Sequence, residues 1–320
     1  MKTISELFKI EKNPQRGPLV IEWMVLAYMV FTLCIVLFAF TRVENPESMI
    51  WGRVRVLATM AALWVAYRLV PCKFTLGARV IVQLGLLGWW YPDTYELNRL
   101  FPNLDHIFAR AEQSLFGCQP ALYFASSWGN RVVSELMSMG YASYYPMIAL
   151  VVLYYYFRRY AEFQRAACVV LASFFIYYVV YIFVPVAGPT FYYKAIGVAN
   201  AAHGIFPNVH DYFNTHTACL PTPGYEDGFF YHMVEEAKAA GERPTAAFPS
   251  SHVGVATVCI LLAAHTGNRR LTLWLVPFYV FLCLSTVYIQ AHYVIDAIAG
   301  LLSGVALYFA LMLSLKSLKR

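Results

Sequence analysis

The feature that most limits how this chain can fold is a series of long apolar runs with almost no charge. Runs at roughly 18–40, 166–186, 271–289 and 292–315 each provide about the 20 residues that a helix needs to cross a bilayer. Over 320 residues, 60% of side chains are hydrophobic and only 13% are charged, about half the charged share of a soluble domain. This composition cannot cover a water-soluble globule, so lipid is the expected solvent for much of the chain.

Four further apolar runs raise the expected number of helices; they lie at roughly 54–71, 75–92, 141–157 and 250–265. The second of these is the least regular, because Arg79 and Gln83 interrupt it. We therefore predict an all-α fold, a polytopic transmembrane helix bundle with about six to eight spans.

Positive charges fall unevenly on the two sides of these runs. With a cytoplasmic N-terminus, 14 Lys and Arg residues lie inside and nine outside, although the outside segments are longer. The positive-inside rule then predicts that both termini are cytoplasmic and that segments 93–140 and 187–249 lie on the periplasmic or lumenal face. The net charge of +6 is thus a topology signal, and we expect no nucleic-acid partner.

Segment 93–140 has a helical pattern of its own. Apolar residues recur there at helical spacing, with polar residues between them: Leu104, Ile107, Phe108, Ala111, Leu115 and Phe116, interleaved with Asp105, Arg110, Glu112 and Gln113. This pattern predicts an amphipathic helix lying in the membrane interface. A small soluble cap helix fits the same pattern equally well.

Two short polar motifs open the last apolar runs at their outer ends. Ser250, Ser251 and His252 precede one run, while His292 and Asp296 open another. Residues four apart share a helix face, so Asp296 can reach one ring nitrogen of His292 and raise the basicity of the other. Both helices run from outside to inside, which places the two histidines at the same depth. Each serine also suits a simple helix cap, but an acid one turn into an apolar helix usually has a function.

A third polar stretch follows the run at 166–186. It contains Gly188, Pro189, Tyr192, Tyr193 and Lys194, and we expect it to bind substrate beside the two histidine motifs. Three helix ends can then meet at the outer boundary of the membrane.

The order and spacing of these motifs resemble the type 2 phosphatidic acid phosphatase superfamily. The PSxH and HxxxD blocks are similar to that superfamily's second and third signatures. The resemblance implies that His292 is the nucleophile, Asp296 its orienting acid and His252 the general acid. A weaker likeness, at 115–120 and 141–145, points to the branch that contains inositol phosphorylceramide synthases.

Three positions depart from the superfamily pattern. Gly188 stands where the family has an arginine, Tyr181 where it has a lysine, and Ser285-Thr286 where it has Ser-Arg. A phosphomonoester dianion needs such cations, whereas a phosphodiester lipid carries only one negative charge. The departures therefore favour a phosphodiester substrate.

From these features we predict transfer of a phospho-head group, expected to be phosphoinositol, from a glycerophospholipid to a lipid hydroxyl such as that of ceramide, through a phosphohistidine. The amides near Ser250 and Ser251 are expected to bind phosphoryl oxygens, and Lys194 or Arg243 to supply positive charge. Residues 1–140 form N-terminal spans and the interfacial helix; 141–320 form the catalytic core, with a long outer loop at 187–249 over the site. No cofactor or metal is required.

Several alternatives stay open at this stage. A phosphatase of the same superfamily would use water as the acceptor. A proton-coupled transporter would use the histidines as a proton relay. In a structural membrane subunit the histidines would have no chemical role. The loop at 187–249 either recognises the head group or is merely solvated. Cys118 and Cys219 lie in the two outer segments and can pair in an oxidising compartment. The pattern does not specify an oligomeric state.

Overall fold

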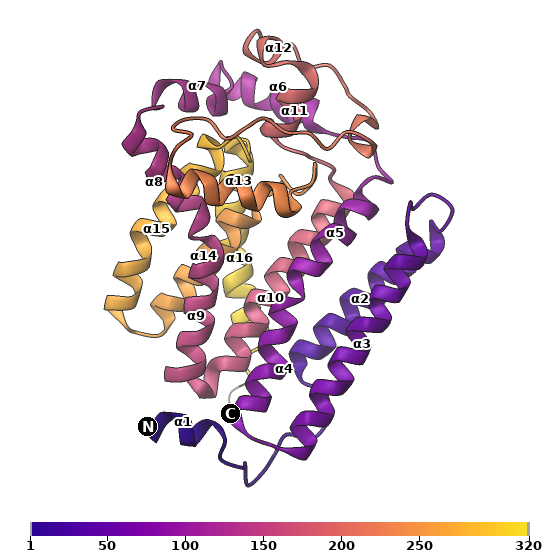
Figure 1. Ribbon diagram of the computed structural model, residues 1–320, viewed down its shortest axis with the longest axis vertical. Coiled ribbons are helices and arrows are strands. Elements are labelled where there is room, and N and C mark those ends of the chain that lie inside the picture. Colours follow the sequence, from indigo (N-terminus) through magenta and orange to yellow (C-terminus); the bar gives the residue numbers. More distant parts are fainter. Residues whose placement is uncertain (1, 319–320) are drawn as a thin grey trace.

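The computed structural model describes residues 2–318, and the regular elements within them are helices (Figure 1). This confirms the predicted all-α bundle. The longer helices are α2 (Val20–Phe38), α3 (Pro46–Leu69), α9 (Tyr144–Arg158), α10 (Tyr160–Phe183), α14 (Ser251–His265), α15 (Arg269–Tyr288) and α16 (Val294–Ser314). The shorter ones are α1 (Lys2–Leu7), α4 (Lys73–Gly85), α5 (Leu87–Asn98), α6 (Asp105–Phe116), α7 (Pro120–Ser127), α8 (Arg131–Ala142), α11 (Pro189–Ile196), α12 (Val198–Ala202), η1 (Tyr212–Asn214) and α13 (Phe229–Gly241).

Five helices are long and apolar enough to cross a bilayer, namely α2, α3, α10, α15 and α16. Together, α8 and α9 add a sixth if they form one span broken by a 45° bend. These helices fit an integral membrane protein, and with the bent pair counted as one span their number reaches the lower end of the predicted range. Two expected spans are shorter: the run at 75–92 breaks near Leu86 into α4 and α5, and α14 has 15 residues.

Local sequence signals set the reversal between α14 and α15. The side-chain oxygen of Asn268 accepts hydrogen bonds from the backbone amides of Arg270 and Leu271, which caps α15. Gly267, one residue earlier, has a φ of +75°. Glycine adopts that conformation without the strain that a Cβ atom causes. The chain can therefore turn back within a few residues and place α15 beside α14.

Helix α10 forms the centre of the bundle. Of its apolar window, 72% is buried, compared with 28% for α3 and 22% for α16. Helices α2, α4, α5, α9, α14 and α16 pack around it. The outer helices α3 and α16 keep most of their apolar surface on the outside, as helices in contact with lipid do.

Glycines allow α14 and α16 to approach closely. A Cβ atom at Gly304 would lie 2.5 Å from the carbonyl oxygen of Gly254, and one at Gly300 would lie 2.4 Å from that of Ser250. Small residues permit this kind of backbone contact between apolar helices. The contact aligns the first turns of α14 and α16, which carry or follow the two histidines of the sequence motifs.

We call the end of the bundle with these first turns the site end; α1 and the last turn of α16 lie at the opposite end (Figure 1). Helices α6, α7, α11, α12 and α13 cover the site end. The two segments predicted to be outside thus fold largely as short helices joined by turns. The expected division of the chain at residue 140 stays a proposal, and α8 runs across that position.

Helix α6 reverses the usual amphipathic arrangement of a cap helix. Its apolar residues Ile107, Leu115 and Phe116 are exposed, whereas Asp105 and Glu112 are fully buried. An outward apolar face is what a helix in a membrane interface requires. The sequence predicts this helix, but not that two of its acids point into the protein.

Two buried ion pairs join the N-terminal helices. Arg79 of α4 donates to both carboxylate oxygens of Glu22 in α2, at 2.8 and 2.6 Å. Arg53 of α3 lies 2.9 Å from the carboxylate of Asp93 in α5. Because all four side chains are buried, each charge depends on its partner for compensation.

Candidate active site

His292 lies in the short connection between α15 and α16, with its side chain buried. Its Nδ1 atom is 2.8 Å from the backbone carbonyl oxygen of Ala247. A carbonyl oxygen only accepts hydrogen bonds, so Nδ1 carries the proton of the neutral ring. The lone pair is then on Nε2, which is the form that a nitrogen nucleophile needs.

His252 is the second residue of α14, and its Nδ1 atom lies 3.4 Å from Nε2 of His292. Its ring packs against those of Tyr141 and Tyr144, with centroid separations of 4.7 and 4.4 Å. These aromatic contacts hold the ring of His252 toward the second histidine. The structure thus brings together the two histidines that the sequence placed at the same depth.

Asp296 has a different arrangement from the one expected. Its Oδ2 atom accepts a hydrogen bond from the backbone amide of Tyr293 at 2.9 Å, and it lies 3.8 Å from Nδ1 of His292. The second distance permits electrostatic attraction but is too long for a hydrogen bond. The carbonyl oxygen of Ala247 therefore orients the ring, while Asp296 caps α16 and places a buried carboxyl group nearby.

The environment of His292 favours its neutral form. Burial lowers the pKa of this histidine to about 4, against opposing effects from the hydrogen bond to Ala247 and from the charge of Glu242. A lower pKa means that the ring is deprotonated at neutral pH. His292 is therefore ready to act as a nucleophile without a base to remove a proton from it.

The first turn of α14 offers one free amide beside the histidines. The side chain of Ser250 accepts from the amide of Val253 at 3.3 Å, and the amide of Ser251 donates to the hydroxyl of Tyr181 at 2.9 Å. Within residues 2–318, the His252 amide has no hydrogen-bond acceptor. Ser250 thus caps α14, the amide of Ser251 is bonded to Tyr181, and the His252 amide is the one in this turn that is available to bind an anion.

Gly188 marks a point where no side chain fits. It has a φ of +92°, and a Cβ atom there would lie 2.4 Å from the carbonyl oxygen of Ala291. Its amide donates to Asp105 at 2.9 Å, as does the amide of Ala187 at 2.7 Å. An arginine cannot replace Gly188 without moving the chain, and the amides that precede Pro189 are already occupied by a carboxylate.

The other two departures from the superfamily pattern are also buried and uncharged. The hydroxyl of Tyr181 donates to the carbonyl oxygen of Pro249 at 2.8 Å, in addition to accepting from Ser251. The carbonyl oxygen of Thr286 accepts from the His292 amide at 3.0 Å. Across the described part of the chain, no Lys or Arg side chain hydrogen-bonds to either histidine ring.

Four residues that were expected to bind substrate do not hydrogen-bond to the histidines: two are buried and bonded elsewhere, and two are exposed. The hydroxyls of Tyr192 and Tyr193 donate to the carbonyl oxygen of Pro207 and to the side chain of Gln119, at 2.8 and 2.7 Å. Both tyrosines are buried structural residues of the site end. The side chains of Lys194 and Arg243 are exposed, and neither contacts the histidines through a hydrogen bond.

Sequence reasoning missed three acids at the site end: Asp105, Glu112 and Glu242. The side chains of Asp105 and Glu112 were assigned only to the polar positions of an amphipathic helix. Glu242, at the end of α13, has a buried Oε2 atom without a partner among the described residues and lies within electrostatic range of His292. Burial raises its pKa. Nothing in the sequence indicated that Glu242 would lie near the two histidines.

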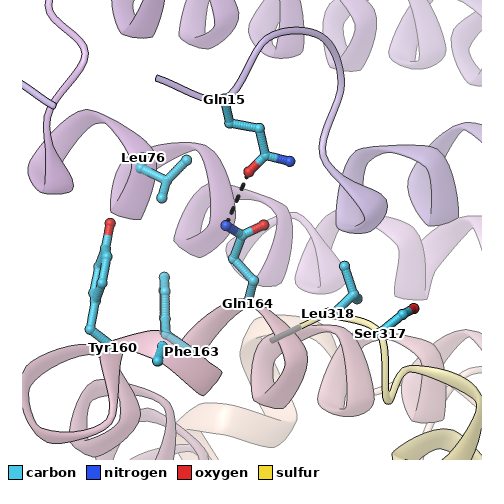
Figure 2. Close-up of a pocket in the computed structure, with 8 residues that line it drawn as sticks. Gln15, Leu76, Tyr160, Phe163, Gln164, Ser317 and Leu318 are labelled. Carbon is cyan, nitrogen blue, oxygen red and sulfur yellow. Dashed lines mark hydrogen bonds between the residues drawn. The ribbon is translucent and has the colours of Figure 1, made fainter. Parts of the chain in front are cut away.

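No group of three or more His, Cys, Asp or Glu side chains suited to a metal occurs within the described residues. Cys118 and Cys219 are free thiols in the structure. A cavity of about 100 Å³ lies at the opposite end of the bundle, where Gln15 and Gln164 hydrogen-bond at 3.3 Å beside Tyr160 (Figure 2). It is remote from the histidines and contributes nothing to their chemistry.

Comparison with known proteins gives one match. The family model described as the PAP2 superfamily matches residues 106–310, which is more than half of the chain. No curated protein and no solved structure matches it.

Proposed function

Because the chain belongs to the PAP2 superfamily, we propose that it is a membrane lipid phosphotransferase of the inositol phosphorylceramide synthase type. It would move a phospho-head group, with phosphoinositol as the first candidate, from a glycerophospholipid to a lipid hydroxyl such as that of ceramide. Superfamily membership itself indicates lipid phosphatase or phosphotransferase activity. The observation that carries the choice between them is that no Lys or Arg side chain among residues 2–318 hydrogen-bonds to either of the paired histidines.

The charge of the site supports a phosphodiester substrate. Tyr181, Gly188 and Thr286 occupy the positions where the family signatures have basic residues, and all three are buried. A phosphomonoester dianion would enter this site without a cation to compensate its second charge, which is unfavourable away from water. A diester has one charge, and the free His252 amide can hold one of its oxygens.

In the first step, Nε2 of His292 attacks the phosphorus of the donor lipid. A nitrogen–phosphorus bond forms, the bond from phosphorus to the glycerol oxygen breaks, and His252 gives a proton to the departing diacylglycerol. The buried His252 ring is neutral in the free site, so it takes up this proton from water when the anionic lipid binds beside it. The phosphorylated ring of His292 keeps its Nδ1–H, which still donates to the carbonyl oxygen of Ala247. The ring now carries a positive charge, and the carboxyl group of Asp296, 3.8 Å away, helps to offset it.

In the second step, His252 is neutral and acts as a base. It takes the proton of the acceptor hydroxyl, whose oxygen attacks phosphorus and releases Nε2 of His292. The new lipid phosphodiester leaves, and His252 is again an imidazolium. The substrate phosphorus must enter between the two rings, so their nitrogen atoms, which lie 3.4 Å apart, must separate.

The location of the site supports access from one leaflet. We propose that the site end faces the periplasm or lumen, that both termini are cytoplasmic, and that 187–249 contacts the head group above a catalytic core formed by 141–320. The distribution of Lys and Arg supports this orientation. The bilayer, the phospholipid donor and the lipid acceptor are the partners that this function requires.

Analysis of lipid products tests the proposal. Purified protein in liposomes receives phosphatidylinositol labelled in its head group, with or without ceramide. We expect a labelled lipid that forms only with ceramide, together with an equal amount of diacylglycerol. His292→Ala should abolish it. His265→Ala, at the exposed last residue of α14 and at the opposite end of that helix from His252, is the matched control and should retain it.

Other outcomes select among the alternatives. Label that appears only in a water-soluble product, with or without ceramide, would establish the phosphatase. Uptake of a solute driven by a proton gradient, with no lipid conversion, would favour the transporter. Equal inactivity of wild type and His292→Ala toward all head groups tested would reject the catalytic proposal.

A further inference from the structure

One face of α6 is made of side chains that are completely buried. Asp105, Ala109 and Glu112 follow one another at helical spacing and are all 0% exposed. The small side chain of Ala109 lets the helix lie close to the chain beneath it. Acids are rarely buried without basic partners, and no Lys or Arg side chain in the described residues pairs with either acid, so their contacts need an explanation.

Asp105 binds segments from two different parts of the chain. Its Oδ2 accepts from the amide of Ala187 at 2.7 Å and from the side chain of Asn103 at 2.6 Å. Its Oδ1 accepts from the amide of Gly188 at 2.9 Å and from the hydroxyl of Tyr293 at 3.1 Å. Both carboxylate oxygens are therefore fully used, and one of their partners is the residue directly after the proposed nucleophile.

Glu112 holds the first turn of α16. Its Oε1 accepts from the amide of Val294 at 2.5 Å and from that of Ile295 at 3.4 Å. Asp296 accepts from the preceding amide, that of Tyr293. These amides have no partners within their own helix, because they lie at its start. Side-chain carboxylates thus bind three successive amides immediately after His292.

We propose that α6 positions the catalytic histidine, with Asp105 and Glu112 as positioning residues that hold the backbone beside His292. This inference rests on the proposed function, since it takes Nε2 of His292 as the atom that attacks phosphorus. A nucleophile displaced by about 1 Å can lose about 100-fold in rate without any change in the reacting groups. Neither acid hydrogen-bonds to a histidine ring, so both act through the backbone that carries His292.

The two acids predict opposite responses to amide substitution. Glu112 uses only Oε1, and its Oε2 has no partner among the described residues. Burial also raises the pKa of Glu112 to about 8, so a neutral side chain resembles its state at pH 7. Glu112→Gln therefore keeps the acceptor. Asp105→Asn must place an NH₂ group against an N–H or O–H donor, because both oxygens of Asp105 are occupied.

Two measurements test this difference. The first is kcat and KM for ceramide-dependent lipid formation in liposomes; the second is hydrogen–deuterium exchange of the amides at 293–295. For Glu112→Ala and Asp105→Asn we expect kcat to fall about 100-fold with KM within about threefold of wild type, and exchange to be faster. Glu112→Gln should stay within about threefold of wild type in both parameters. Ser114→Ala, exposed on the same helix, is the control.

Failure of this inference can be distinguished from failure of the proposed function. If wild type makes no lipid product, the proposed function fails, and exchange at 293–295 still decides whether α6 holds this segment. If wild type is active and Glu112→Ala keeps its kcat and its exchange rates, the positioning role is rejected. Equal damage by Glu112→Gln and Glu112→Ala would also reject it, because glutamine keeps the oxygen that accepts from the Val294 amide and should therefore keep the activity.

Discussion

The N-terminal helices and the site end both bury ionisable side chains, but they compensate them differently. In the N-terminal helices a buried acid forms an ion pair with a base, as Glu22 of α2 does with Arg79 of α4. At the site end a buried acid accepts hydrogen bonds from backbone amides, as Glu112 does from the amide of Val294. An ion pair sets how two helices pack, whereas a carboxyl group bonded to a backbone amide sets the path of the chain itself.

This difference has a chemical consequence. Acids that bind amides do not need cations beside them, so the first turn of α16 can be ordered without a Lys or Arg side chain bonded to the histidines. A site of that kind suits a monoanionic diester better than a dianion. We therefore expect the ion pairs to affect stability and the amide-bound acids to affect catalytic geometry, and measurements of activity can separate the two effects.

The largest loss of activity is expected for His292→Ala. Without Nε2 no phosphohistidine can form, so turnover should fall by more than about 10³-fold. The carbonyl oxygen of Ala247 loses its partner, which should reduce stability by about 1–3 kcal/mol. Turnover per folded protein and thermal unfolding in detergent measure the two effects separately. Turnover above a few per cent of wild type would contradict the assignment.

A smaller loss, about 10² to 10⁴-fold, is expected for His252→Gln, because proton transfer to and from the lipid oxygens is lost. In the first step, the fall in rate caused by His252→Gln should be smaller for a donor with a nitrophenol leaving group than for the natural donor, because nitrophenolate departs without protonation. Release of nitrophenol in a single turnover measures this. An equal loss for natural and activated donors would show that His252 has another role.

The pH dependence of activity is a further consequence of burial. Protonation of His292 removes its nucleophilic lone pair, and burial lowers the pKa of this group to about 4. The neutral, active form therefore persists below the ordinary histidine range, and kcat/KM should fall on the acid side only as pH approaches that lowered pKa. A series of pH values in liposomes would reveal it. An acid limb near pH 6.5, the ordinary value for histidine, would contradict the neutral buried ring.

The smallest effect on activity is expected in the N-terminal helices. Arg79→Met leaves the carboxylate of Glu22 buried without its partner, and should reduce stability by about 3–5 kcal/mol. Adding Glu22→Gln should recover much of this, since the amide oxygen can still accept from the Leu19 amide. At temperatures where these variants are folded, kcat should stay within about twofold of wild type. A large loss of kcat in the folded single variant would break the comparison between the two regions.

Part of this arrangement was accessible from the sequence. Long apolar runs predict the bundle, because lipid-facing helices must be apolar over their whole length. The meeting of His252 and His292 follows from motifs that begin helices of the same direction. These features depend on local periodicity and on membrane geometry, both of which a single sequence contains.

Other contacts had no local signal. Glu112 and Ala247 bond to partners far along the chain. Backbone amides and carbonyls are present at almost every residue, so nothing in the sequence marks those that are used. Tyr192 and Tyr193 show the converse: aromatic residues beside a motif suggested a substrate contact, yet their hydroxyls bind other parts of the protein.

The most direct test of the central claim is detection of the covalent intermediate. Wild-type protein would be incubated with phosphatidylinositol in the absence of acceptor, digested at neutral pH and analysed by mass spectrometry. We expect a phosphoinositol group on the peptide that contains His292, and its loss with formation of a lipid diester when ceramide is added. Turnover without any adduct, or an adduct on His252 that ceramide discharges, would contradict it.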